Sequence, residues 1–282
     1  MKKNFVTIGI VLAIVIGGFL IFANRGNGVF SGPHATIKIL IPVSGVDVIV
    51  DDTIVGKSRP AGETFSTNVS LGNHTVIVTK KTFWPWSKKI IAEKGQIISF
   101  KPFLITQNVS GSVITASDPE YNGLFQRVSN SSLPRLKSNA PAKKTDETLK
   151  DWVDKNVLNK KVSNDGTVAL WVNNNSVFAA WIGPADTIDN AIFCTPECNT
   201  VTEVLPSRSV IRNVEFYKDR NDLIVISTSN SIFIVELDRR DTQNFQPLYT
   251  GTLPTFYKPE NPNAIIVKDA LQGGTVLMEI AL

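Results

Sequence analysis

The chain has 282 residues, of which 43% are hydrophobic and 19% are charged, and this ordinary composition disfavours extended disorder. The formal net charge is only +4, and no basic block of the kind that follows a phosphate backbone occurs, so nucleic-acid binding is disfavoured. The length is sufficient for two domains.

Residues 5–23 form an uncharged apolar run directly behind Lys2 and Lys3. As a helix the run spans about 28 Å, close to the hydrocarbon thickness of a bilayer. We predict a retained single-span anchor, with a cytoplasmic N-terminus and residues 24–282 on the extracytoplasmic side, because the positive charges precede the run. A cleaved signal peptide is the alternative, but it needs a shorter apolar core and a small residue where Ile21 stands.

Small residues recur every four positions within this run, at Gly9, Ala13 and Gly17. Such a stripe lets two membrane helices approach closely, and it predicts a homodimer contact through the anchor. The alternative is that Gly and Ala are simply frequent in spanning helices.

Short β-rich segments follow a Gly- and Asn-rich spacer at residues 24–34. Turn residues separate the segments, and no helical pattern interrupts them, which predicts a small β-sandwich. The predicted strands are Ala35–Leu40, Val46–Val50, Thr64–Val69, His74–Lys80, Lys88–Ala92 and Gln96–Phe100.

Two parts of this region resemble PEGA domains. Residues 48–56, VIVDDTIVG, are similar to that family's opening of strand, acidic turn and strand, and residues 69–79 carry a similar G-x-H-x-V-x-V strand pair. Phe83–Trp86 stands where the family has an aromatic turn, whereas the order Pro60–Glu63 departs from the motif that names the family. The resemblance covers residues 35–104, and it implies a β-sandwich module of envelope proteins without catalysis.

The aromatic turn places three large rings around Pro85. An exposed Trp84 or Trp86 gives a platform for a sugar ring or an anchor that faces the membrane. The alternative is a packed hairpin tip whose indole N–H groups are paired locally.

Residues 105–144 are polar and rich in turn residues, and we predict a connector there. An amphipathic helix is predicted over residues 145–160, with Thr145 as its N-cap. Leu149 and Trp152 lie on its apolar face, so we expect the helix to dock on the β domain that follows and to bury Trp152 largely.

The last part of the chain contains three similar pairs of β segments, each joined by a tight polar turn, which predicts three hairpins. The turn centres lie near Asn174, Asn230 and Gly273. They are about 56 and 43 residues apart, near the ~40–50 residues of β-propeller blades. The three pairs of segments are Thr167–Trp171 with Ser176–Trp181, Leu223–Thr228 with Ser231–Glu236, and Ala264–Lys268 with Thr275–Ile280.

Residues 145–282 resemble propeller-like segments that follow PEGA domains in some envelope proteins, a likeness carried mostly by residues 236–249. Three copies fall short of the four blades that closure requires. The predicted fold is therefore mainly β: an N-terminal transmembrane helix within residues 1–23, a PEGA-like β-sandwich, and an incomplete β-propeller-like domain with one amphipathic helix.

The two cysteines, Cys194 and Cys198, are predicted to form a disulfide on the extracytoplasmic side. Free thiols and a metal or redox pair are the alternatives. A metal pair lacks partners in the sequence, because the only histidines are His34 and His74.

No catalytic motif occurs in the sequence, and we expect no cofactor and no metal. The acidic cluster with the best composition for calcium is Asp219–Asp222, although Asp in such a turn usually satisfies the local backbone. We expect a membrane-anchored envelope protein that acts as a non-enzymatic binding or scaffold module for a protein or carbohydrate partner. The alternatives are a carboxylate-dependent envelope hydrolase and a subunit of a larger membrane assembly.

Overall fold

The computed structural model describes residues 32–57, 60–131, 133–140, 143, 147–194, 199–206, 209–271 and 274–282. The described part is mainly β, and its sheets are open rather than closed. Within it, no helix is both long enough and apolar enough to cross a bilayer. The predicted anchor at residues 5–23, with its Gly9, Ala13 and Gly17 stripe, lies outside the described residues.

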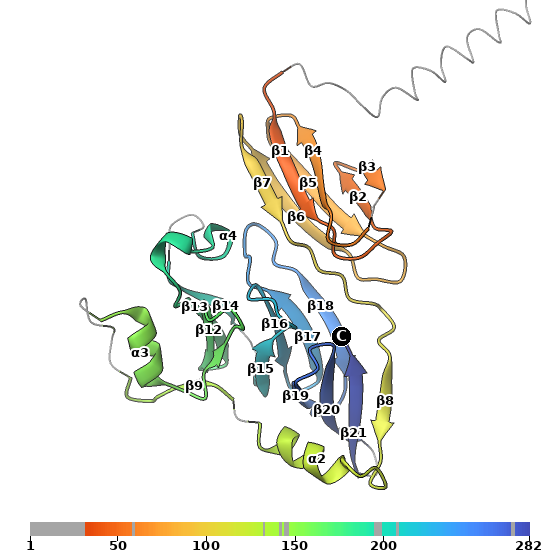
Figure 1. The fold of residues 1–282 in the computed structure, drawn as a ribbon, viewed down its shortest axis with the longest axis vertical. Helices are drawn as coiled ribbons and strands as arrows, with labels where there is room; N and C mark the ends of the chain where they lie inside the picture. Colours follow the sequence, from red (N-terminus) through yellow and green to blue (C-terminus); the bar gives the residue numbers. More distant parts are fainter. Residues whose placement is uncertain are drawn as a thin grey trace, which may run out of the picture. The chain divides into compact units, whose positions relative to one another are not determined.

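The chain divides into two compact units (Figure 1). The N-terminal unit comprises Met1–Val78 and Ile90–Pro102, and the C-terminal unit comprises Thr79–Lys89 and Phe103–Leu282. This division differs from the predicted one, because Thr79–Lys89 groups with the C-terminal residues although it lies inside the region that resembles a PEGA domain.

Two sheets make up the strands of the N-terminal region. One has the order β4-β1-β7 and the other β3-β2-β5-β6. Their strands are β1 (Ala35–Leu40), β2 (Asp47–Val50), β3 (Thr53–Lys57), β4 (Thr64–Val69), β5 (Gly72–Thr79), β6 (Trp86–Ala92) and β7 (Ile97–Phe100). Every predicted strand is present to within a few residues. The strands alternate between more and less buried positions, and in β1 every second residue, beginning with Ala35, is buried.

The hairpin between β2 and β3 turns at Asp51 and Asp52, which have φ angles of 48° and 63°. Two consecutive residues with positive φ fit the tight hairpin turn whose twist matches that of the flanking strands. The Asp51 carboxylate accepts a hydrogen bond from the Thr75 backbone N–H on β5 (2.9 Å), which ties this turn to the neighbouring strand.

The C-terminal unit contains three antiparallel arrays of four strands. Each predicted hairpin forms the middle of one array, with one further strand on each side of it. The arrays are β11-β12-β13-β14, β15-β16-β17-β18 and β19-β20-β21-β8.

The first array consists of β11 (Lys161–Val162), β12 (Val168–Asn173), β13 (Ser176–Trp181) and β14 (Val201–Pro206), extended by β9 (Arg135–Leu136) and β10 (Val157–Leu158). The second consists of β15 (Asn213–Phe216), β16 (Leu223–Ser227), β17 (Ser231–Glu236) and β18 (Phe245–Thr250). The third consists of β19 (Thr255–Tyr257), β20 (Ala264–Leu271), β21 (Gly274–Ala281) and β8 (Gly111–Ile114). Short helical segments η2 (Ala185–Thr187) and α4 (Asn190–Phe193) precede β14.

The strand β8 corrects the prediction of a connector over residues 105–144. It pairs antiparallel with β21 and completes the last array, although the two strands are far apart in sequence. The same segment contains a helix, α2 (Tyr121–Ser129), in addition to the one amphipathic helix that was predicted after the anchor. Alternation over only four residues, three of them exposed, is too short a signal to identify β8.

A helix covers each of the two outer arrays. The predicted helix is α3 (Leu149–Asn156), shorter than residues 145–160 and capped by Thr148 rather than by Thr145. It packs against the first array in a cluster with Ala169, Trp171 and Ala180. The helix α2 packs on the third array, where Val128 is buried with Ile266 and Leu277. Terminal sheets of a stack need such covers for their apolar faces.

The half-buried ring of Trp152 lies on α3 and meets Trp171 edge to face, with ring centroids 6.3 Å apart. The helix therefore docks on the β domain as predicted, but Trp152 is half-buried rather than largely buried. A helix of eight residues covers only part of the sheet, so one edge of the indole stays in contact with solvent.

The middle and outer arrays share a core and polar contacts. Apolar residues of β12, β13, β15, β16 and β17 form one buried cluster. On the other side, Asp269 of β20 accepts from the Tyr249 hydroxyl (2.9 Å) and from the backbone N–H of Leu253 (2.8 Å) after β18. Burial and the Asp269 carboxylate raise the pKa of Tyr249 to about 12.

Candidate functional site

The most extensive polar network of the C-terminal unit is centred on Lys88 in β6. Trp86 and Lys88 are two residues apart, so they point to the same face of the strand, and both are 1% exposed. A lysine is rarely buried to this degree unless its ammonium is paired. The position of Lys88 therefore requires acceptors deep in the unit.

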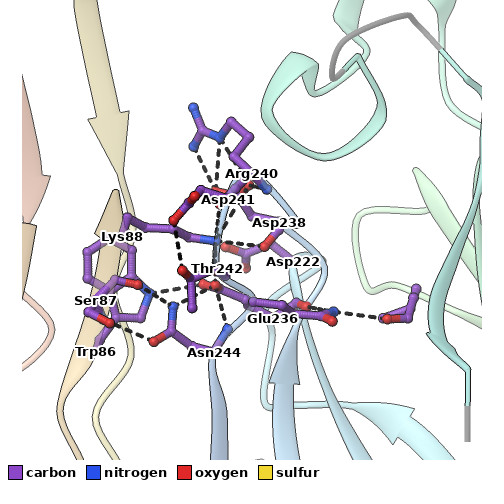
Figure 2. A network of polar contacts seen from close by, with 12 residues as sticks. Trp86, Ser87, Lys88, Asp222, Glu236, Asp238, Arg240, Asp241, Thr242 and Asn244 are labelled. Atoms are coloured by element: carbon purple, nitrogen blue, oxygen red, sulfur yellow. Dashed lines mark hydrogen bonds and ion pairs between the residues drawn. The ribbon is translucent and has the colours of Figure 1, made fainter. Parts of the chain in front are cut away.

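Oxygen atoms from one segment of the chain surround the Lys88 ammonium (Figure 2). Nζ donates to the backbone oxygens of Thr242 (2.7 Å) and Asp238 (2.8 Å), and it lies 2.6 Å from Glu236 Oε1. The backbone oxygen of Arg240 lies farther away at 3.3 Å, and Asp238 Oδ1 lies at 3.8 Å. We call these oxygens of residues 236–242 the ammonium cage.

The segment between β17 and β18 holds its own shape through local contacts. The carboxylate of Asp238 accepts from the backbone N–H of Arg240 and from its guanidinium, at 2.7–3.1 Å. Asp241 has a φ of 55°, which reverses the chain direction within the segment. The Gln243 amide donates to the backbone oxygens of Glu236 (2.7 Å) and Val204 (3.0 Å).

Glu236 ends β17 and has several donors besides the lysine. Its Oε2 accepts from the indole N–H of Trp86 (2.9 Å), and its Oε1 accepts from both the backbone N–H (2.8 Å) and the side-chain amide (2.7 Å) of Asn244. Burial raises the pKa of Glu236, and the Lys88 ammonium and these donors oppose that shift. The carboxylate thus accepts from donors on β6 and from Asn244, directly before β18.

Two carboxamide side chains at the start of β18 bind the backbone of other segments. Asn244 accepts from the Ser87 N–H (3.0 Å) and donates to the Ser87 oxygen (2.9 Å), as a neighbouring strand would. Gln246 accepts from the Ile105 N–H (2.6 Å) and donates to the oxygen of Phe103 (2.9 Å). These contacts fix residues 85–88 and 103–105 within the C-terminal unit.

The network is chemically saturated. The three N–H donors of the ammonium have three acceptors within 2.8 Å, and both oxygens of Glu236 have donors. Across the described residues, no buried side-chain nitrogen or oxygen lacks a hydrogen-bond partner. Both members of the ion pair are thus engaged by groups of the chain itself.

A second constellation, in the N-terminal unit, contains serine, histidine and aspartate. His74 Nδ1 lies 2.5 Å from Asp51 Oδ2, and His74 Nε2 lies 2.8 Å from the backbone oxygen of Ser70 and 3.4 Å from its Oγ. Both ring nitrogens therefore face oxygen atoms of the chain. Because Nε2 binds the carbonyl oxygen, it cannot take a proton from the Ser70 hydroxyl, and the trio lacks the geometry of a catalytic triad.

Of the two predicted ligand-binding tryptophans, the structure places only Trp84 at the surface, with 36% of its area exposed. Trp86 is buried, and its indole N–H binds Glu236, so the structure corrects its assignment to a surface platform. The physical reason is alternation along β6, which turns Trp86 inward together with Lys88.

Aspartates in the acidic turns bind other groups of the chain itself. Asp222 is paired with Arg220 (2.6 Å), and Asp165 accepts from Ser163, Thr167 and Asn221. Burial raises the pKa of Asp165, but these hydrogen bonds outweigh it and hold the pKa below its usual value. Among the described residues, no group of three or more His, Cys, Asp or Glu side chains is placed to hold a metal ion.

The cysteine prediction extends beyond the described residues. Cys194 is disulfide-bonded. Its predicted partner, Cys198, lies outside the described residues, so the pairing of the two stays a prediction.

Sequence reasoning missed Lys88 and Glu236, which contact each other although they lie far apart along the chain. One signal was present: Lys88 shares its strand face with Trp86, which makes it a charged residue at an inward position. Glu236 likewise ends the apolar strand Ser231–Glu236. Neither signal identifies the partner, because a single sequence does not reveal which strand ends meet.

No family model and no curated protein matches the chain. Among solved structures, it is similar to the AfRom2 CNH domain, with 12% identity over 80% of this chain and 67% of that chain and a TM-score of 0.27. It is also similar to a putative membrane-associated protein of unknown function from Bacteroides fragilis NCTC 9343, with 8% identity over 89% of this chain and 96% of that chain and a TM-score of 0.20. The dehydratase domain from the CurF module of curacin polyketide synthase gives 12% identity over 94% and 80% of the two chains, with a TM-score of 0.14. At these TM-scores the likenesses carry no argument about this chain.

Proposed function

We propose that the chain is a non-enzymatic binding or scaffold protein of the cell envelope that recruits an extended partner segment through the edge strand β3. Its anchor is the run at residues 5–23, with residues 24–282 on the extracytoplasmic side. The proposal treats the N-terminal sheets as a PEGA-like sandwich and the three C-terminal arrays as an incomplete propeller-like domain.

The observation that carries the proposal is the exposure of β3. Among the described residues, this strand pairs with one strand, β2, and no strand is paired with its other edge. Ile54 is 56% exposed and Val55 is 37% exposed, so aliphatic side chains stand on both faces of the strand. Natural edge strands are usually protected by charges or bulges, and an exposed apolar edge favours addition of another strand.

The close packing behind β3 supports a rigid binding edge. A Cβ atom at Gly56 would lie 2.5 Å from the Phe65 ring, so β3 and β4 approach as closely as glycine permits. Rigid edges bind extended segments with little ordering cost on the receptor side.

The saturation of the ionisable groups supports a non-enzymatic role over the hydrolase alternative. Glu236 and Asp238 neutralise and position Lys88, and Asp269 closes the turn after β18. A carboxylate-dependent hydrolase needs an acid and a base on either side of a substrate bond. These three carboxylates instead bind groups of the chain itself.

Photo-crosslinking in intact cells tests the proposed edge. The full chain carries a photoreactive amino acid at Val55 or, as the control, at the exposed Lys94 in the turn before β7. We expect a discrete crosslinked product from Val55 that is absent from Lys94, and Ile54→Lys combined with the Val55 probe should remove it. Equal labelling at both positions, or a product that survives Ile54→Lys, would contradict binding at β3.

Protease digestion of spheroplasts tests the proposed placement separately. We expect external protease to digest residues 24–282 and to leave a short membrane-embedded fragment. Full protection would overturn the orientation, and a mature N-terminus near Asn24 would overturn the anchor.

A further inference from the structure

We propose that the ammonium cage is a receptor for a primary ammonium group, which Lys88 occupies within the same chain. The inference concerns a binding site in the C-terminal unit and is independent of the edge strand β3.

The acceptors match the donors of a primary ammonium in number and charge. Three oxygens lie within 2.8 Å of Nζ, namely the backbone oxygens of Asp238 and Thr242 and the Glu236 carboxylate. A primary ammonium has three N–H donors and one positive charge. One short carboxylate contact balances the charge, and two neutral carbonyl oxygens complete the hydrogen bonds.

Contacts that do not involve the lysine hold the cage in shape. Asp238 is clamped by the Arg240 guanidinium, and Gln243 binds the backbone oxygen of Glu236. Asn244 donates to the Glu236 carboxylate from its backbone and its side chain, while Trp86 holds the other carboxylate oxygen. These contacts bind the oxygens of the cage independently of Lys88, and we infer that the cage is preorganised for an ammonium ligand.

The geometry also defines what the cage rejects. Arginine presents five donors in a planar fork, which does not match three acceptors that converge on one atom. A neutral group of the same size leaves the Glu236 charge buried without a cation, and such an uncompensated charge is strongly unfavourable.

Chemical rescue of Lys88→Ala tests the receptor directly. The substitution removes Cγ, Cδ, Cε and Nζ, and these atoms together correspond to propylammonium. The full chain is kept in detergent micelles, and thermal unfolding is followed by near-ultraviolet circular dichroism with propylammonium chloride, propanol or tetramethylammonium chloride. We expect propylammonium to raise the unfolding midpoint by roughly 2–4 °C or more and to act more strongly as its concentration rises.

Two further variants separate ammonium recognition from cavity filling. Lys88→Met fills the space of the side-chain stem, and Glu236→Gln in the Lys88→Ala background removes the negative charge; propylammonium should stabilise neither. An equal effect of propanol, or rescue that persists after Glu236→Gln, would overturn the proposal, and so would rescue by potassium chloride as strong as that by propylammonium.

Refolding keeps the proposal testable if Lys88→Ala is unfolded at all temperatures. The variant is then diluted from denaturant into each solute, and recovery of the native near-ultraviolet spectrum is measured. Recovery with propylammonium alone supports the receptor, and failure with every solute overturns it.

Discussion

Each unit contains a close contact between a basic side chain and a carboxylate that joins distant parts of the chain, and the two contacts differ in burial. In the N-terminal unit, the side chains of His74 and Asp51 are 8% and 48% exposed. In the C-terminal unit, those of Lys88 and Glu236 are 0% and 6% exposed. Solvent screens the first pair on one side, whereas the second lies in a low-dielectric interior, where both its attraction and the cost of breaking it are larger.

The pairs differ also in how many other groups depend on them. Asp51 joins a tight turn to the neighbouring strand, so its loss affects one hairpin. Glu236 binds Trp86 of β6 and Asn244, directly before β18, in addition to the lysine, so its loss leaves the donors of both residues without this acceptor. The two pairs have similar distances, 2.5 Å and 2.6 Å, but differ in burial and in the number of groups they bind. We therefore expect the Lys88–Glu236 pair to contribute more to stability than the His74–Asp51 pair.

The largest expected effect is that of Glu236→Ala. The substitution leaves the Lys88 ammonium buried without its carboxylate, and we expect the free energy of unfolding to fall by about 3–5 kcal/mol. Chemical denaturation of the full chain in detergent measures the change. Asp154→Ala, which removes a partner of the exposed Lys150, serves as the control and should leave the denaturation midpoint near that of the unmodified chain.

Trp152→Ala examines the cover that α3 gives to the first array. The half-buried indole packs against Trp171, and its truncation should lower the free energy of unfolding by about 2–3 kcal/mol, below the usual loss for a fully buried tryptophan. A loss below about 0.5 kcal/mol, measured by the same denaturation, would show that α3 does not stabilise the array.

Gly251→Ala tests the close packing around Asp269. A Cβ atom at this position would lie 2.0 Å from Asp269 Oδ2 and 2.6 Å from the Tyr249 ring, so we expect a loss of about 1–3 kcal/mol. Gly123→Ala in α2 is the matched control, because a Cβ there meets nothing within 4 Å and alanine favours helix by about 0.5–1 kcal/mol. Equal effects of the two substitutions would contradict the packing around Asp269.

The smallest expected effect is the acid sensitivity that Asp51 contributes. Burial raises the pKa of Asp51, but hydrogen bonds from His74 and Thr75 outweigh it and hold the pKa below its usual value. A carboxylate whose pKa is lower in the folded state adds stability above its unfolded pKa, and that stability disappears as the pH falls through the folded pKa. Asp51→Asn should therefore flatten the acid side of the stability profile slightly, as measured by unfolding midpoints between about pH 2 and 5. An unchanged acid limb would contradict this assignment.

The sequence predicted those parts of the fold that local patterns determine. Alternation located most strands of the N-terminal unit and the central hairpin of each C-terminal array, and Asp51-Asp52 and Asn174-Asn175 marked tight turns whose residues all have positive φ. The apolar face of α3 was read correctly, although its length was not. These features depend on neighbours within a few residues.

The rest depends on contacts that a single sequence does not specify. The short strand β8 pairs with β21, which is far away in the sequence. In β18 the apolar Phe245 is exposed and the polar Gln246 is buried, so residue polarity does not follow burial there. Of the two tryptophans considered for a surface platform, only Trp84 is exposed. Trp86 was misplaced because the alternation of β6, which points it inward, was not taken into account. The same alternation would have marked Lys88 as a buried charge, but only the structure shows which oxygens receive it.

A double-mutant cycle between Lys88 and Glu236 tests the central claim, that this pair acts as a unit within the fold of the C-terminal unit. Lys88→Met and Glu236→Gln are made singly and together, and the free energy of unfolding is measured for all four proteins. Because each single change leaves a buried group without its partner, the losses should not add, and we expect a coupling energy of about 2–3 kcal/mol. A coupling energy near zero, with the two losses simply additive, would contradict the account.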